Sequence, residues 1–307
     1  MDRTDQTAIM ESDAVDLNQL KHKIYQEAIR DIGQSGYEAH IRDLFGRPVL
    51  DFAKTLVINL PGSCYANCSY CIDKGLRKNV MDYDDFLETC EIVLKEKHDF
   101  NEVSITGGSL PSDKFNELID IIQKYCPDVK ITWNTNGANI NSSYNVSHIK
   151  YINLHRNSAD DKTNKELFYT DTEIISIEDF KQFAENKLCI RVTVDKDFDI
   201  DEYVKYKTPM YLNRLLPGNT ETEKVFNKVK TALNITEDTD VRRRNHYING
   251  IYKDIPVRLC VGDHLAKHVP NKYPAWLNVV IIHRSGVVAG SWYEDDKFLY
   301  KKANKSN

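Results

Sequence analysis

Strand-like and helix-like segments alternate along the chain from residue 55 onward, and this alternation limits the possible folds more than any other feature. Short apolar runs rich in Val, Ile and Leu are separated by longer segments whose apolar residues recur every three or four positions. This order favours a parallel sheet whose strands are joined by right-handed helical crossovers. The expected strands are 55–60, 103–106, 130–135, 151–154, 188–194 and 210–216, and the expected helices between them include 82–95, 112–125 and 177–186.

The length of the chain agrees with one such domain and its appendages. The chain has 307 residues, whereas single α/β barrels often reach about 200–250 residues. Six strand–helix units are fewer than the eight that close a complete barrel. Beyond them, the pattern predicts a polar helix at 221–233 and a β-hairpin over 279–289.

Polar or glycine-rich segments follow most of the expected strands. In parallel α/β sheets, ligands bind at the carboxyl ends of the strands. We therefore expect one binding site along this end of the sheet. The segments that meet there are the cysteine-containing loop after residue 60, Gly107-Gly108, Asn134–Gly137, His155-Arg156 and Asn213-Arg214.

Three cysteines, Cys64, Cys68 and Cys71, crowd into the loop that follows the first expected strand. The chain has seven cysteines, and an odd number with three close together does not indicate a disulfide framework. In a reducing compartment such a group more often binds metal. Three thiolates on one loop can hold three irons of a cubane iron–sulfur cluster. The fourth iron then has no protein ligand, and an open metal position is a site of chemistry.

This loop resembles the cluster-binding motif of the radical S-adenosylmethionine (radical SAM) superfamily. Its pattern is Cys64-x3-Cys68-x2-Cys71, with the aromatic Tyr70 before the last cysteine, and it follows the first strand of a βα series. The resemblance covers roughly residues 50–220. It implies an α/β fold with a partial (βα)6 TIM-like barrel at 51–218, preceded by a helical segment at 1–50 and followed by a small α+β extension at 219–307.

The resemblance also implies a chemistry. In the superfamily, the three cysteines bind a [4Fe–4S] cluster, and S-adenosyl-L-methionine chelates the fourth iron through its amine and carboxylate. One electron from the reduced cluster cleaves the sulfonium, and the 5′-deoxyadenosyl radical so formed abstracts hydrogen from a substrate. An electron donor such as a flavodoxin or a ferredoxin is implied as a partner.

Further residues match the superfamily by position. Tyr70 corresponds to the residue that packs near the adenine of the cofactor. Gly107 and Gly108 correspond to the segment whose backbone receives the methionyl ammonium, and Ser109 stands where the family places an acidic residue. Polar contacts to the cofactor, including its ribose or carboxylate, are expected from Asn134, Asn136, His155 and Arg191.

The segment after residue 219 resembles a trimmed auxiliary domain, because its expected hairpin lacks the cysteines that bind a second cluster in many superfamily enzymes. Cys260 stands alone before this hairpin. It either packs in the core or donates hydrogen from its thiol to a substrate radical.

Arg214 either clamps a carboxylate or phosphate of the substrate or pairs with a helix carboxylate. We expect Cys90, Cys126 and Cys189 to pack as small apolar side chains.

The sequence leaves the substrate open between a small polar metabolite, a nucleoside-like molecule and a peptide. One alternative is an RNA-modifying enzyme that contacts phosphates through Arg242, Arg243 and Arg244. Another is a non-catalytic iron–sulfur or zinc protein on the same fold, which the serine at position 109 favours.

The net charge and the hydropathy of the chain limit which partners and which cellular locations we expect. The net charge of −5 provides no general attraction to nucleic acids or to anionic membranes. No apolar run of about 18 residues is present, so we expect no transmembrane helix. The first residues lack the basic-then-apolar order of a signal peptide, and we expect a cytoplasmic protein.

Overall fold

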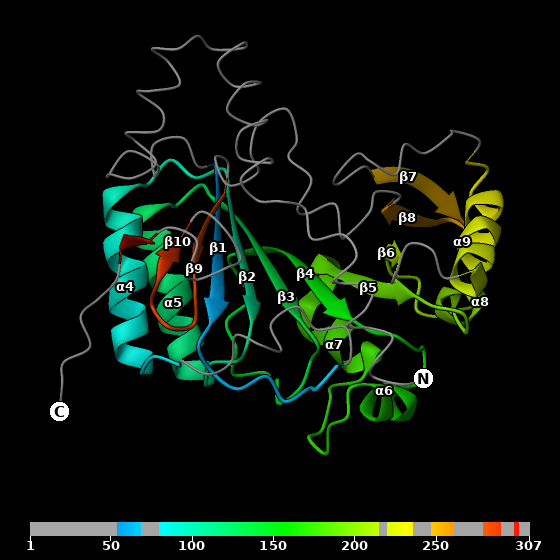
Figure 1. Cartoon of the computed structure of the whole chain (residues 1–307), viewed down its shortest axis with the longest axis horizontal. Coiled ribbons are helices and arrows are strands. Elements are labelled where there is room, and N and C mark those ends of the chain that lie inside the picture. The colour runs from blue at the N-terminus through cyan, green and yellow to red at the C-terminus, as the bar shows by residue number, and fades with distance from the viewer. Residues whose placement is uncertain are drawn as a thin grey trace, which may run out of the picture.

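The strands of the computed structural model form one mixed sheet at the centre of the molecule (Figure 1). The structure describes residues 54–68, 80–214, 220–235, 247–260, 279–289 and 298–300. Within them the sheet has 11 strands in the order β11-β10-β9-β1-β2-β3-β4-β5-β6-β8-β7. The first six strands are β1 (Thr55–Leu60), β2 (Glu102–Gly107), β3 (Lys130–Thr135), β4 (Ile149–His155), β5 (Leu188–Val194) and β6 (Met210–Arg214).

These six strands confirm the expected alternation. Each pairs with the next in parallel and in chain order. In the described part of the chain the sheet stays open, because β1 and β6 pair with strands from the C-terminal part and not with each other. The fold is therefore α/β with a partial, TIM-like (βα)6 layout. The helical segment expected at 1–50 lies outside the described residues.

Helices cover the outer face of this sheet. Four of them each bury one phenylalanine in a shared apolar core: Phe86 of α4, Phe115 of α5, Phe180 of α7 and Phe226 of α9. The helices are α4 (Tyr83–Glu96), α5 (Ser112–Tyr125), α6 (Asp161–Leu167), α7 (Ile177–Ala184), the short η1 (Glu185–Lys187), α8 (Asp201–Val204) and α9 (Thr220–Ala232).

Side-chain caps set where several helices begin. The Asp82 carboxylate accepts from the backbone N–H of Asp84 at 2.9 Å, before α4. The Ser176 hydroxyl accepts from the N–H of Asp179 at 3.0 Å, before α7. Such caps satisfy backbone donors that the first helical turn leaves without partners.

The C-terminal part of the chain extends the sheet at both edges. β8 (Ile255–Cys260) pairs in parallel with β6 and carries β7 (Tyr247–Tyr252) antiparallel on its far side. At the other edge, β9 (Val279–Ile282) pairs in parallel with β1 and antiparallel with β10 (Val288–Ala289), and β11 (Phe298–Tyr300) follows. The hairpin expected over 279–289 is thus present. No helix in the described part is both long and apolar enough to cross a membrane.

Alternation along the strands separates an apolar outer face from a polar inner face. In β5, Ile190 and Val192 are fully buried against the helices, whereas Arg191 and Thr193 point to the opposite side and are half-buried. Successive side chains of a strand face opposite sides, and β2 shows the same division, with Val103 and Ile105 buried and Ser104 and Thr106 half-buried.

A matched pair of substitutions tests this division. Val192→Thr places a hydroxyl in the helix-packed core and should lower the free energy of unfolding by about 1–3 kcal/mol. The reverse change at the next residue, Thr193→Val, alters the inner face and should stay within about 0.5 kcal/mol of the parent. Urea unfolding followed by circular dichroism measures both; equal losses would contradict the assignment of faces.

Candidate metal and cofactor site

The cysteine loop leaves the sheet at the carboxyl end of β1. Cys64 and Cys68 are half-buried and pack against an apolar cluster of Ala66, Ala138, Phe168 and Ile174. The backbone N–H of Asn67 donates to the carbonyl of Phe168 at 2.7 Å, which ties the loop to the residue after α6. In Figure 1 this blue segment runs along the lower rim of the sheet toward α6. Tyr70 and Cys71 lie outside the described residues.

Asn136, at the end of β3, directs its side chain at the cysteine loop. Its Nδ2 lies 4.0 Å from the Sγ of Cys64, and its Oδ1 accepts from the backbone N–H of Ala138 at 3.1 Å. The second bond fixes which end of the amide faces the sulfur. An N–H that points at sulfur favours the thiolate over the thiol, as a metal ligand requires.

The glycine segment after β2 locks against the cysteine loop. A Cβ on Gly108 would lie 1.8 Å from the carbonyl oxygen of Gly62, and a Cβ on Gly62 would lie 1.8 Å from that of Ser109. Only glycine permits two backbones to approach so closely. The Ser109 hydroxyl completes the contact by donating to the carbonyl of Ser63 at 2.9 Å.

Gly107 permits a similarly close approach between the end of β2 and Asn59 of the neighbouring strand β1. Its φ is +89°, and a Cβ there would lie 1.7 Å from Oδ1 of Asn59 on β1.

Gly107→Ala should therefore lower the free energy of unfolding by about 2–4 kcal/mol, because it adds a clash to a left-handed backbone. Gly250→Ala in β7 is the control: its Cβ would meet the Leu233 side chain at 3.2 Å and should cost less than half as much. Equal losses in urea unfolding would contradict this role of Gly107.

Asn134 is the hub of a polar network on the inner face. Its Nδ2 donates to Oγ of Ser104 at 3.1 Å, and its Oδ1 accepts from Asn153 at 2.9 Å and from Arg191 at 3.4 Å. Ser104 and Asn153 were missed by the sequence interpretation. Their signal was a polar residue at every second position of β2 and β4, which marks a polar face.

His155, at the end of β4, stacks on Phe168 with ring centroids 5.8 Å apart. Burial lowers the pKa of this imidazole to about 3, with the charges of Arg191 and Arg156 acting in the same direction. The side chain is thus neutral at physiological pH. It can offer one donor and one acceptor to a ligand without adding charge.

Arg156, next along the chain, is fully buried. The sequence placed it in a segment of the expected binding site but assigned it no role. Its Nη1 donates to the carbonyls of Asn136 at 2.6 Å and His155 at 2.9 Å, and its Nη2 donates to the carbonyl of Ile175. Its Nε lies 3.6 Å from Oδ1 of Asp161. Burial lowers the pKa of the guanidinium to about 10, so it remains a cation at neutral pH. Arg156 therefore fixes the backbone of Asn136 beside the cysteine loop.

Replacing this cation should be costly. Arg156→Met leaves buried carbonyl oxygens and Asp161 without their donor, and should lower the free energy of unfolding by about 3 kcal/mol. Lys253→Met is the control, since it breaks an exposed ion pair with Asp201 of 2.7 Å and should cost less than about 1 kcal/mol. Urea unfolding compares the two, and similar losses would contradict a structural role for Arg156.

The other predicted residues differ in where the structure places them and in how deeply they are buried. Cys260 is buried at the end of β8 in register with Asn213 of β6, and Arg214 ends β6 with its side chain outside the described residues. Cys90 and Cys126 are buried as expected, but Cys189 is half-buried on the polar inner face, which corrects that expectation. Because Cys71 is not described, no group of three His, Cys, Asp or Glu suited to a metal occurs in the described ranges.

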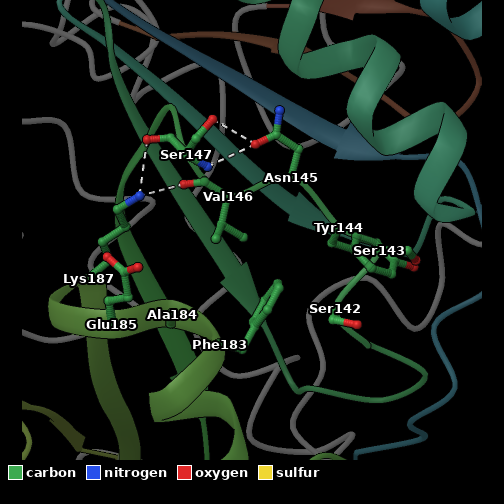
Figure 2. Close-up of a pocket in the computed structure, with 10 residues that line it drawn as sticks. All are labelled: Ser142, Ser143, Tyr144, Asn145, Val146, Ser147, Phe183, Ala184, Glu185 and Lys187. Atoms are coloured by element: carbon green, nitrogen blue, oxygen red, sulfur yellow. Dashed lines mark hydrogen bonds between the residues drawn. The ribbon is translucent and has the colours of Figure 1, made fainter.

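A cavity of about 450 Å³ opens at the opposite end of the sheet, among the loops that precede β4 and β5 (Figure 2). Figure 2 shows the Lys187 ammonium directed at two backbone carbonyls, which accept at 2.8 Å for Val146 and 3.0 Å for Ser147. This cation is engaged in holding the loop, and the cavity is remote from the cysteine loop. We assign it no part in the site.

The fold is similar to that of a protein of known structure, SuiB. SuiB from Streptococcus suis superposes with a TM-score of 0.51 at 16% identity, over 83% of this chain and 64% of SuiB. SuiB bound to the precursor peptide SuiA gives 0.52 at 17% identity, over 78% and 60%. The chain thus spans less than two thirds of SuiB. No protein-family model and no curated protein matches the sequence. At this identity the likeness shows that the chain shares the fold of SuiB.

Proposed function

We propose that the protein is a radical SAM enzyme with one [4Fe–4S] cluster held by Cys64, Cys68 and Cys71. The observation that carries the proposal is the position of the cysteine loop, at the carboxyl end of β1 on an open (βα)6 sheet, with the Asn136 amide facing Cys64. When bound, the cluster would supply the electron that cleaves S-adenosyl-L-methionine and so starts hydrogen abstraction from the substrate.

The residues around the loop fit such a cluster. Thiolates are the usual ligands of iron–sulfur clusters, and burial and hydrogen bonds to sulfur set the reduction potential. The wall of Ala66, Ala138, Phe168 and Ile174 excludes water from one side of Cys64 and Cys68. The Asn136 amide would donate toward the Cys64 sulfur from another side.

The chain's own groups would bind and orient the cofactor. The backbone of Gly107 and Gly108 would face the methionyl ammonium, with lone pairs of the Ser109 hydroxyl as further acceptors. Tyr70 would pack near the adenine. Neutral His155 suits a ribose hydroxyl, and Asn134 and Asn136 complete the polar surface of the cofactor. Arg191, which donates to Asn134, lies at the border between the cofactor and the substrate.

The substrate we propose is a peptide. The sequence left a small polar or nucleoside-like molecule open as well, and the lack of cysteines for an auxiliary cluster argued mildly against the common peptide-modifying enzymes of the superfamily. Support comes from SuiB, whose structure holds a precursor peptide. A flavodoxin or ferredoxin would supply the electron. The RNA-modifying alternative depends on Arg242, Arg243 and Arg244, which lie outside the described residues.

Two further roles are part of the proposal. Cys260 and Arg258 are two residues apart on β8 and so face the same side, opposite Val257 and Leu259, which pack in the core. This position suits a thiol that donates hydrogen to a substrate radical. Arg214 would clamp an anionic group of the substrate. The chain would consist of a helical segment at 1–50, the barrel core at 51–218 and an extension at 219–307 that covers the open side of the barrel.

Anaerobic reconstitution with iron and sulfide, followed by dithionite and S-adenosyl-L-methionine, tests the function. The parent should show the visible absorption of an iron–sulfur cluster and release 5′-deoxyadenosine. Cys64→Ala and Cys68→Ala should lose both, because three thiolates are needed to hold the cluster. Cys90→Ala, which removes a buried thiol from α4, should keep both. A parent with three intact cysteines that yields neither signal would refute the enzyme and favour a non-catalytic protein.

A further inference from the structure

Two arginines flank one tyrosine on three neighbouring strands of the inner face. Arg191 of β5 is in register with Tyr211 of β6, and Tyr211 is in register with Arg258 of β8. We propose that Arg191, Tyr211 and Arg258 form a subsite for a carboxylate side chain of the substrate. This inference rests on the proposed function and names the chemistry of its peptide: an Asp or Glu side chain.

The tyrosine ring holds both guanidinium groups. The Cζ of Arg191 lies 5.2 Å from the ring centroid and that of Arg258 lies 5.9 Å from it. Contacts of this kind are attractive and restrict the rotamers of both side chains. Guanidinium groups held in place in this way lose less entropy when they bind an anion, and their planar N–H pairs match a carboxylate.

Arg191 brings a positive charge to this row. Among the described residues, no carboxylate lies within ion-pair distance of Arg191, whose described hydrogen bond goes to the neutral Asn134. Glu102 of the inner face lies on β2, where Thr132 donates to it at 3.0 Å and Lys130 lies 3.5 Å away.

Two titratable neighbours among the described residues, His155 and Cys189, add no negative charge to this row. His155, in register with Arg191, is neutral because its pKa is about 3. Burial raises the pKa of the Cys189 thiol to about 12, and the two arginines act in the opposite direction. Neither group therefore places a negative charge beside Arg191.

Position favours the substrate over the cofactor as the source of the carboxylate. Asn136, which approaches Cys64, follows β3, and β8 lies four strand spacings further along the sheet. At about 4.8 Å per spacing this is roughly 19 Å along the sheet. A methionyl carboxylate bound beside the cysteine loop lies nearer to Arg191 than to Arg258, so a side chain of an extended peptide is the better source of a carboxylate held by both arginines.

The probes are N-acetylglutamate amide and N-acetylglutamine amide, which differ only in the charged group. Binding to the full chain is measured by ligand-observed NMR without a cluster, so the result is independent of reconstitution. We expect the glutamate probe to bind more tightly than the glutamine probe. Arg258→Gln should weaken binding of the glutamate probe about tenfold, because it removes charge-assisted hydrogen bonds.

Control variants separate the subsite from general charge and from misfolding. Lys228→Gln removes one exposed charge from α9 and should leave probe binding unchanged. Arg258→Lys keeps the charge without the planar N–H pairs and should give an intermediate loss. Circular dichroism checks the fold of each variant. If Arg258→Gln is misfolded, Arg258→Lys carries the comparison.

Several outcomes would overturn the proposal. These are equal binding of the two probes, unchanged binding by Arg258→Gln, and tighter binding of inorganic phosphate than of the glutamate probe. A fourth contradicting outcome would come from measuring S-adenosyl-L-methionine binding to the reconstituted protein. If Arg258→Gln weakens S-adenosyl-L-methionine there and leaves the glutamate probe unaffected, the carboxylate belongs to the cofactor. Unchanged cofactor affinity in that variant supports the substrate assignment.

Discussion

The buried guanidinium of Arg156 is the interaction on which the site depends. A charge without water is costly unless its hydrogen bonds are made, and Arg156 makes them with backbone carbonyls at the ends of β3 and β4 and near the start of α7. One of these carbonyls belongs to Asn136, whose amide faces Cys64. The position of the cysteine loop is thus coupled to a cation that touches no cysteine itself.

The two faces of the sheet divide the work of folding and binding. Helices bury the outer face in a continuous apolar core, which supplies most of the stabilisation. The inner face keeps its polar groups, and these bond to one another across β2, β3, β4 and β5 through Asn134. A face already braced in this way can bind polar ligands with little rearrangement.

Local patterns in the sequence were enough to predict the six parallel strands and the placement of Cys64, Cys68 and Gly107. Each depends on periodicity or spacing within a few residues. The roles of Arg156, Asn153 and Tyr211 were missed, because their partners lie on other strands and are fixed by register. The sequence also did not predict that β8 joins β6 and β9 joins β1, which are pairings across long stretches of chain. Cys189 lies in an apolar segment typical of a strand and was therefore expected in the core. The alternation of side chains along β5 places it on the inner face.

The central claim is that the cysteine loop holds a cluster whose fourth iron accepts S-adenosyl-L-methionine. Low-temperature electron paramagnetic resonance of the reduced, reconstituted protein tests it most directly. The account predicts a signal of a reduced [4Fe–4S] cluster that changes shape when S-adenosyl-L-methionine is added, because the open iron gains ligands. A signal that the cofactor leaves unchanged, or no signal from protein that retains zinc, would contradict it.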